Sequence, residues 1–396
     1  MASLYRSKRM TVYLSIDILE EILLRLPVKS LIVFKCVSKQ WLSLISNPSF
    51  ARRHSLQKLG RSVTGLFVQD PSWLGLYGNA FVFLDESKRN NVISKSFNPY
   101  AKSLPCPIDF RRRTIQSCNG LLCCKTSHNN PTFYVYNPST NHHKILPRSP
   151  FKKDGFKSFC SVSLAFDPDK SPHYEVISIW AHKCRTLGVE IYSSKSESWK
   201  DLGMVNGSGR IYIVEDTGVF LNGSLHWFNR YGSCYLDVGE KSLQLKKMPA
   251  PPVAREDQVY GQTTWIVYFG ECNGHIHLMK AYRKFPTSLY IMELEMDYTK
   301  WKVKYHINIE LLTSAYYSEM VFDMHYQSIQ DFSVLFVEDH DDDESKTSKM
   351  VIQIREHIIF YDLKDMTFNE VKDIQLTRRH PYKRLATPFI ESLACV

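Results

Sequence analysis

The sequence predicts an α+β multidomain chain, in which a small N-terminal helical unit precedes a large all-β propeller. Three observations lead to this class. Residues 13–50 repeat their apolar side chains at helical spacing. After about residue 60 the pattern changes to the alternation of apolar and polar residues that is typical of strands. Short hairpin-like units then recur at a near-constant interval up to the last residues.

The first candidate helix has one broad apolar face. Its apolar positions are Ile18, Leu19, Ile22, Leu23 and Leu26. Asp17 followed three residues later by Glu20 fits a capping box, and Ser15 is an alternative N-cap. Pro27 ends this helix, because a proline inside a helix costs about 3 kcal/mol.

Three further short helices follow. Apolar stripes at residues 31–37 and 41–45 indicate two of them, and Asn47-Pro48 reads as the N-cap and first position of another. We expect this last helix to run to about Leu59 with Phe50 and Leu56 facing inward. Helices this short cannot bury so much apolar surface among themselves, so the pattern predicts a partner that covers it.

These residues resemble an F-box, the module that docks onto the Skp-type adaptor of cullin–RING ubiquitin ligases. The matching segments are Asp17-Ile18-Leu19, Glu21-Ile22-Leu23, Arg25-Leu26-Pro27, Lys29-Ser30-Leu31 and Phe34–Lys39 with Trp41. The family usually opens with Leu-Pro, whereas Leu14 is followed here by Ser15. We expect that difference to weaken docking without abolishing it. A helical subdomain that packs only on its own chain is the alternative.

The resemblance implies a set of adaptor-binding residues. They are Leu14, Ile16, Ile18, Leu19, Ile22, Leu26, Pro27, Leu31, Val37 and Trp41. Some of them must instead form the internal core of the module, and the sequence does not separate the two groups.

One hairpin unit recurs along the second part of the chain. It places an apolar residue, a polar turn and a second apolar residue seven positions on, at Phe97…Leu104, Tyr136…His143, Tyr192…Trp199, Leu236…Leu243, Leu294…Trp301 and Tyr361…Phe368. Asn-Gly, the strongest short hairpin signal, begins further hairpins at Asn119, Asn222 and Asn273.

The spacing of these units sets the expected number of blades. From Tyr136 to Tyr361 they lie about 56 residues apart, so residues 61–396 hold six. We therefore expect a six-bladed propeller, with five or seven blades and a two-layer sandwich as alternatives. A strand at Phe389–Leu393 is expected to close the ring against Leu66–Val68.

This second part also resembles a known domain. Segments such as SCNGLLCC (117–124), GVFLNGSLHWF (218–228) and IFYDLKDMTFNEV (359–371) are similar to the F-box-associated domain of plant F-box proteins, a kelch-like propeller. We divide the chain into a basic tail at 1–11, an F-box at 12–58 and the propeller at 59–396. The combination implies a non-catalytic substrate-recognition subunit of an SCF ligase. Its partners would be a Skp-type adaptor, through it cullin and RING subunits, and an unknown protein to be ubiquitinated.

Composition excludes several other classes. The net charge is +10, but residues 1–60 hold ten Lys/Arg against three Asp/Glu, so the rest is close to neutral. A broad nucleic-acid surface is not expected on such a chain. No apolar run is long enough to cross a membrane, and the first residues lack the apolar core of a signal peptide. We expect a soluble intracellular protein, nuclear or cytoplasmic, whose scattered cysteines stay reduced.

Catalytic motifs are missing from the sequence. No GxGxxG opens a helix, and neither GxxxxGK[ST], GxSxG nor HExxH occurs. His275 and His277 lie on one face of a predicted strand, where half a metal site is the less favoured interpretation. We expect no metal and no cofactor. The alternative function is a carbohydrate- or small-molecule-binding propeller with a degenerate F-box, and a propeller enzyme is the least favoured.

Overall fold

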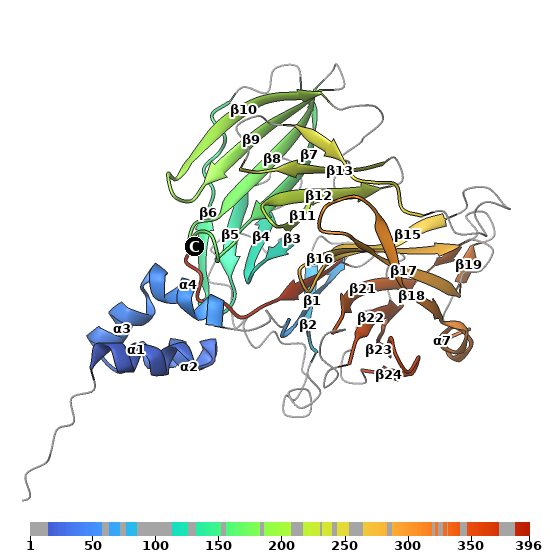
Figure 1. Cartoon of the computed structure of the whole chain (residues 1–396), viewed down its shortest axis with the longest axis horizontal. Helices are drawn as coiled ribbons and strands as arrows, with labels where there is room; N and C mark the ends of the chain where they lie inside the picture. Colours follow the sequence, from blue (N-terminus) through green and yellow to red (C-terminus); the bar gives the residue numbers. More distant parts are fainter. Residues whose placement is uncertain are drawn as a thin grey trace, which may run out of the picture.

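The computed structural model places a helical unit at one side of a ring of β-sheets (Figure 1). It describes residues 15–57, 63–71, 77–84, 113–125, 132–151, 156–182, 186–206, 217–229, 232–239, 244–252, 264–282, 287–318, 321–323, 328–330, 332–340, 347–371 and 385–396. Leu14, the tail at 1–11 and the unit Phe97…Leu104 lie outside these residues.

Four helices form the helical unit. They are α1 (Ile16–Leu24), α2 (Val28–Phe34), α3 (Lys39–Ile45) and α4 (Pro48–Gln57). Ser15 is the N-cap of α1, and its hydroxyl accepts a hydrogen bond from the backbone N–H of Ile18 at 3.3 Å. Ser38 caps α3 in the same way through the N–H of Trp41. Pro48 is the first residue of α4, as predicted.

The core of this unit differs from the expectation at one position of α4. Phe50 is buried, whereas the side chain of Leu56 is 51% exposed. His54 takes the inward position instead, where it stacks on Phe50 and bonds through Nε2 to the carbonyl oxygen of Leu26 at 2.8 Å. Four residues separate Phe50 from His54, which places both on one helical face.

Within the described ranges, five antiparallel sheets of four strands form complete blades. The first contains β3 (Arg113–Cys118), β4 (Leu121–Lys125), β5 (Phe133–Asn137) and β6 (His142–Ile145). The second contains β7 (Phe156–Ala165), β8 (Glu175–His182), β9 (Thr186–Ser193) and β10 (Ser198–Asn206). The third contains β11 (Val219–Leu221), β12 (Ser224–Asn229), β13 (Gly232–Asp237) and β14 (Leu245–Lys247).

The last two complete blades follow in chain order. The fourth contains β15 (Thr264–Cys272), β16 (His275–Tyr282), β17 (Ser288–Leu294) and β18 (Trp301–Asn308). The fifth contains β21 (Phe332–Glu338), β22 (Lys349–Ile354), β23 (His357–Asp362) and β24 (Phe368–Glu370). Between them lie the helix α7 (Glu310–Ala315) and a hairpin of β19 (Val321–Asp323) and β20 (Ser328–Gln330).

A three-stranded sheet joins the two ends of the ring. It consists of β1 (Gly65–Pro71), β2 (Tyr77–Phe83) and β25 (Leu385–Phe389) in the order β2-β1-β25. The inner strands contact one another in a closed circle, since β25 lies against both β3 and β21. The partner predicted for ring closure is therefore right, because Leu66 to Val68 pair with Pro388 to Ala386. The predicted bounds are wrong, because the strand ends at Phe389, where we expected it to begin.

The expected count of six blades is one too high for complete blades. Among the described residues five sheets have four strands, and the remaining place in the ring is taken by the three-stranded sheet. Dividing the length of the domain by the average spacing could not reveal the incomplete sheet. That division counts every stretch of about 56 residues as a whole blade. Among its described residues the first stretch supplies β1 and β2, and the third strand of that sheet comes from the other end of the chain.

The seven-residue hairpin unit is confirmed where its turn is short. Tyr136 pairs with His143, Tyr192 with Trp199, Leu294 with Trp301, and Tyr361 with Phe368. The third blade departs from the unit, because Leu236 pairs with Leu245 rather than Leu243. Its connection is two residues longer than the others.

The Asn-Gly pairs form the predicted turns between the first two strands of their blades. Asn119, Asn222 and Asn273 have φ values of 48°, 52° and 49°, and the glycines that follow them have φ values of 80–88°. Positive φ at both central residues defines the type I′ turn, which matches the twist of the flanking strands.

Buried side chains fill the space between neighbouring sheets. Each adjacent pair of sheets in the ring shares one apolar cluster, and a separate cluster lies inside the helical unit. Apolar burial thus holds the ring together blade by blade.

Candidate functional site

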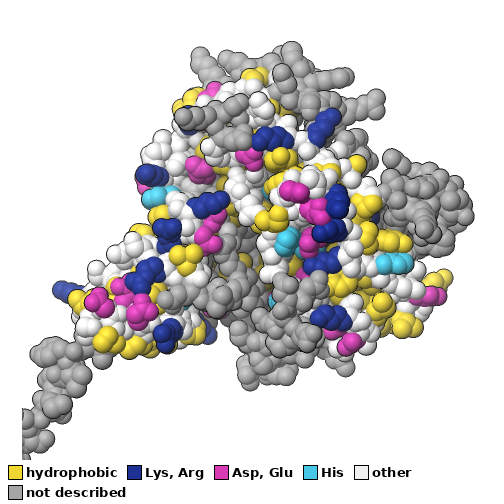
Figure 2. Space-filling model, viewed as in Figure 1, with side chains coloured by type: hydrophobic (Ala, Val, Ile, Leu, Met, Phe, Trp, Pro, Cys, Tyr) yellow, Lys and Arg dark blue, Asp and Glu magenta, His cyan; other side chains and the backbone are white. Residues whose placement is uncertain are grey.

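The helical unit exposes an unusual amount of apolar surface. Six large apolar side chains on or beside α1 to α3 are 46–62% exposed, namely Ile16, Ile18, Ile22, Val33, Val37 and Leu42. Figure 2 shows hydrophobic side chains along the lower edge of this unit, with acidic and basic side chains above them. An exposed cluster of this kind on a small domain is typical of a protein-binding surface.

The structure divides the ten residues expected at the adaptor interface. Ile16, Ile18, Ile22, Pro27 and Val37 are exposed. Leu31 is fully buried, and Leu19, Leu26 and Trp41 are half-buried and pack against the core of the unit. Leu14 lies outside the described residues.

Sequence reasoning missed two exposed residues, Val33 and Leu42. Val33 is two positions from the buried Leu31, so the two side chains point to different sides of α2. The signal was present in the helical spacing, but a helix of seven residues makes fewer than two turns and does not fix its buried face.

Contacts between α1 and α4 hold the exposed face in place. The guanidinium of Arg53 contacts the carboxylates of Glu20 and Glu21, each at 2.6 Å. These pairs are on the surface and contribute little individually. The larger contribution comes from Leu23, Leu24 and Phe50, which are at most 2% exposed.

On the propeller, a compact charge cluster joins the fourth and fifth blades. Lys304 lies 2.9 Å from the carboxylate of Glu293 and 2.5 Å from that of Asp339, and the ring of His277 lies within 4 Å of both acids. His277 is only 1% exposed.

The pKa values in this cluster favour its charged form. Burial alone would lower the pKa of His277, but the neighbouring carboxylates of Asp339 and Glu293 outweigh burial and raise it. His277 and Lys304 together lower the pKa of Glu293 to about 2. Burial opposes the ionisation of Asp339, yet its pKa is also lowered by His277 and Lys304.

The same cluster has the ligand types of a cation site. One atom each from His277, Glu293 and Asp339 lies within 4.8 Å of the others. The ammonium of Lys304 already contacts both carboxylates, so a positive charge occupies the position that a metal ion would need. We therefore interpret the group as a structural ion network between blades.

A second buried polar group links the third and fourth blades. His226 is fully buried, and its Nε2 accepts a hydrogen bond from the hydroxyl of Tyr298 at 2.6 Å. Its Nδ1 lies 3.0 Å from the carbonyl oxygen of Val219, to which it donates. Burial lowers the pKa of His226 to about 4, so the ring is neutral near pH 7. Tyr235 stacks on Tyr298 with ring centroids 4.4 Å apart.

The clustered cysteines are buried thiols. Cys118, Cys123 and Cys124 are at most 6% exposed and make no disulfide. Burial raises the pKa of the Cys123 thiol well above its usual value, which makes this sulfur a poor nucleophile.

Comparison with known proteins decides the family. A family model of the F-box domain matches residues 13–53, and one of the F-box associated beta propeller domain matches residues 79–239. F-box protein At5g07610 from Arabidopsis thaliana is 30% identical over 96% of this chain and 92% of its own length. The chain belongs to the plant F-box proteins.

Two other Arabidopsis thaliana relatives agree with this assignment. F-box protein At5g10340 is 26% identical over 76% of this chain and 71% of its own length. F-box/kelch-repeat protein At3g23880 is 25% identical over 60% of this chain and 65% of its own length. Among solved structures the SapL1 lectin in complex with alpha methyl fucoside has a TM-score of 0.38 at 11% identity, over 79% of this chain and 93% of that chain. That likeness is too distant to carry an argument.

Within the F-box, Ser15 replaces the proline that usually follows the opening leucine. Its extended backbone, with φ −63° and ψ 149°, lies in the range that proline also adopts. Its hydroxyl caps α1, which proline cannot do. The substitution therefore preserves the start of the first F-box helix. Among the described residues of this F-box protein, no helix is long and apolar enough to span a bilayer.

Proposed function

We propose that this F-box protein is the substrate-recognition subunit of an SCF ubiquitin ligase. The observation that carries the proposal is the exposed apolar surface of the F-box, formed by Ile16, Ile18, Ile22, Val33, Val37 and Leu42. A Skp-type adaptor binds this surface in the proposal, and cullin and RING subunits join through the adaptor. The propeller binds the protein to be ubiquitinated.

The division of labour follows the two architectures. We assign residues 12–58 to adaptor docking and residues 59–396 to substrate binding. Leu31, Leu19, Leu26 and Trp41 support the docking surface from inside the F-box core, and the exposed apolar residues contact the adaptor directly. A proline at the entry to α2, Pro27, is exposed beside them.

The mechanism requires no catalytic side chain on this chain. A substrate held by the propeller is kept near the charged ubiquitin-conjugating enzyme, which raises the effective concentration of its lysines. The proposed role is therefore non-catalytic, and it needs a stable adaptor interface of roughly 1,000 Å² or more with apolar anchors.

The alternative of a sugar- or small-molecule-binding propeller depended on a degenerate F-box. Ser15 was the feature that supported it, and Ser15 caps α1. No contact among the described residues favours that alternative.

Affinity purification of the full chain from plant cells, with the proteasome inhibited, tests the proposal. We expect adaptor and cullin to co-purify, together with ubiquitinated proteins that nominate the substrate. The variant Ile18→Asp/Ile22→Asp places two charges on the exposed face of α1 and should lose adaptor and cullin together. Leu311→Asp is the matched control, because Leu311 on α7 is 74% exposed and far from the F-box in sequence. Recovery of neither adaptor nor cullin with the unaltered chain would overturn the proposal.

A further inference from the structure

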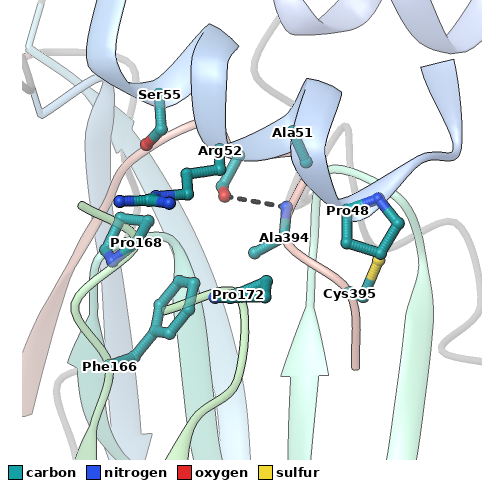
Figure 3. Close-up of a pocket in the computed structure, with 10 residues that line it drawn as sticks. Pro48, Ala51, Arg52, Ser55, Phe166, Pro168, Pro172, Ala394 and Cys395 are labelled. Atoms are coloured by element: carbon teal, nitrogen blue, oxygen red, sulfur yellow. Dashed lines mark hydrogen bonds between the residues drawn. The ribbon is translucent and has the colours of Figure 1, made fainter. Parts of the chain in front are cut away.

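Residues 390–396, which follow β25, lie between the F-box and the first two blades (Figure 3). Leu393 is 6% exposed and belongs to the apolar core of the F-box, together with Leu23 and Phe50. Its neighbour Ala394 belongs instead to the core between the first and second blades. Successive side chains of one segment thus pack into two different domains.

Hydrogen bonds fix the backbone of this segment to the first blade. The side-chain amide of Asn137 donates to the carbonyl oxygens of Ser392 and Ala394, at 3.0 and 2.8 Å. The backbone N–H of Ser392 donates to the hydroxyl of Ser139 at 3.1 Å. Asn137 is fully buried, so its bond to the carbonyl oxygen of Ala394 is shielded from water.

The turn at Asn119-Gly120 leaves room for residues 390–396, because Gly120 has no side chain. A Cβ atom on Gly120 would lie 2.4 Å from the Cβ of Ser392 and 2.8 Å from the carbonyl oxygen of Ile390. Real Cβ atoms do not approach other heavy atoms this closely, so any other residue at this position must displace the segment.

A second contact between the domains lies at a small pocket between α4, the second blade and residues 392–395. Arg52 of α4 donates two hydrogen bonds to the backbone carbonyl of Asp169, at 3.2 and 2.6 Å. Pro48 and Ala51 of α4 line this pocket together with Pro168 of the second blade, and Ala394 and Cys395 line it from the C-terminal segment (Figure 3).

We propose that residues 390–396 act as a strap that fixes the angle between the F-box and the propeller, with Leu393 and Arg52 as positioning residues. The strap is attached to the first blade by hydrogen bonds and to the F-box by one apolar side chain. Its role in ubiquitin transfer rests on the proposed function, because a fixed angle sets where a substrate lies relative to the adaptor.

The distance distribution between two spin labels, measured by double electron–electron resonance, tests the strap directly. The labels are attached to non-natural amino acids in place of Ser43 on α3 and Lys195 in the turn between β9 and β10, both of which are exposed. We expect one narrow distribution for the unaltered full chain. Gly120→Ala should widen it at least twofold.

Gly274→Ala is the matched control for this substitution. Gly274 has nearly the same backbone conformation as Gly120, with φ of 80° against 88°, so alanine is similarly strained at both positions, but nothing lies within 4 Å of the position that a Cβ atom would take at Gly274. It should leave the distribution unchanged. Equal distributions for Gly120→Ala, Gly274→Ala and the unaltered chain would overturn the strap.

A second variant covers the case in which Gly120→Ala fails to fold. Arg52→Ala/Leu393→Ala removes the side chains of the two described contacts between the F-box and the rest of the chain, and Arg148→Ala/Leu311→Ala removes the same residue types from exposed positions. The first pair should widen the distribution while adaptor affinity changes less than twofold, and the second pair should change neither. An unchanged width for Arg52→Ala/Leu393→Ala would also overturn the proposal. Adaptor affinity is measured separately from the distance distribution. Absence of adaptor binding by the unaltered chain would contradict the proposed function, and an unchanged width of the distribution in the variants would contradict the strap.

Discussion

Single residues of the F-box divide into core and surface by exposure, although their chemistry is alike. Leu31 and Val33 stand two positions apart on α2, and their exposed fractions are 0% and 62%. The buried side chain stabilises the module, and the exposed one is available to a partner. Hydrophobicity alone could not assign these roles.

This division predicts different effects for two alanine substitutions. Leu31→Ala should lower the free energy of unfolding by about 2–5 kcal/mol, because it leaves a cavity in the core. Val33→Ala should lower it by less than about 1 kcal/mol and weaken adaptor binding instead. Chemical denaturation followed by circular dichroism measures both. Similar losses of stability for the two variants would show that α2 does not pack as described.

The burial of a single residue, His226, should make the stability of the protein depend on pH. The pKa of His226 is about 4 in the folded protein, below the value of about 6.5 for an unfolded histidine. The unfolded chain therefore binds more protons between these values, so stability is complete above pH 6.5 and is lost as the pH falls toward 4. One pKa unit corresponds to about 1.4 kcal/mol, which gives a loss of about 3 kcal/mol.

The variant His226→Gln isolates this contribution. It keeps a polar side chain near Tyr298 but does not titrate. Thermal unfolding at pH 7.5 and pH 5 should show a smaller loss of stability on acidification for His226→Gln than for the unaltered chain. The same loss in both would assign the pH dependence to other groups.

At the scale of elements, the outer strands are joined by a recurring hydrogen bond. The indole N–H of Trp199 donates to the carbonyl oxygen of Pro147 at 2.7 Å, and that of Trp301 donates to Pro249 at 2.9 Å. Each pair spans 52 residues and joins a blade to the one before it. In the fifth blade the contact comes from another position of the unit, because the hydroxyl of Tyr361 on β23 donates to the carbonyl oxygen of Asn308 at the end of β18, at 3.1 Å. The hairpin repeat therefore carries a contact between blades as well as a turn.

Trp301→Phe should destabilise the propeller by about 1–3 kcal/mol. The change removes the N–H donor and leaves the carbonyl of Pro249 without that partner, while most of the apolar ring remains. Trp199→Phe should lower the stability by less than Trp301→Phe does. Trp199 is half-buried and water can reach its site, whereas Trp301 is 4% exposed. Urea denaturation measures both variants. A larger loss for Trp199→Phe would contradict this interpretation of the links.

The sequence predicted elements well where local chemistry decides them. Pro48 begins α4, the Asn-Gly pairs form turns, and the seven-residue unit fixes the register from Tyr136 to His143. Features that depend on distant residues were not predictable. Burial of His54 rather than Leu56 depends on a contact with Leu26, and the three-stranded sheet depends on a strand from the other end of the chain.

The sequence predicted the residues of the docking site as a group, but not which of them are buried and which are exposed. The F-box resemblance located the docking helices, but short helices leave the buried face undetermined, so Leu31 could not be separated from Val33. The charge cluster around His277 was not predicted, because Asp339 lies in another blade and is 62 residues away from His277 in the sequence. Only the folded ring brings these groups together.

At the scale of the whole molecule, the chain has two ends with different properties. Residues 1–60 carry +7 of the net charge of +10, and the F-box within them exposes apolar side chains. The propeller is nearly neutral and is closed by a strand from the far end of the chain. The segment that follows this strand returns to the F-box, so the closing of the ring and the placing of the F-box depend on adjacent residues.

In the proposed function, the exposed face of the F-box binds a Skp-type adaptor. Isothermal titration calorimetry of the purified full chain with a purified plant adaptor measures that binding. The unaltered chain and Leu311→Asp should bind with the same dissociation constant, and Ile18→Asp/Ile22→Asp should bind at least about tenfold more weakly, a loss of about 1.4 kcal/mol or more. Equal affinity of all three proteins, or no binding by the unaltered chain, would contradict the account.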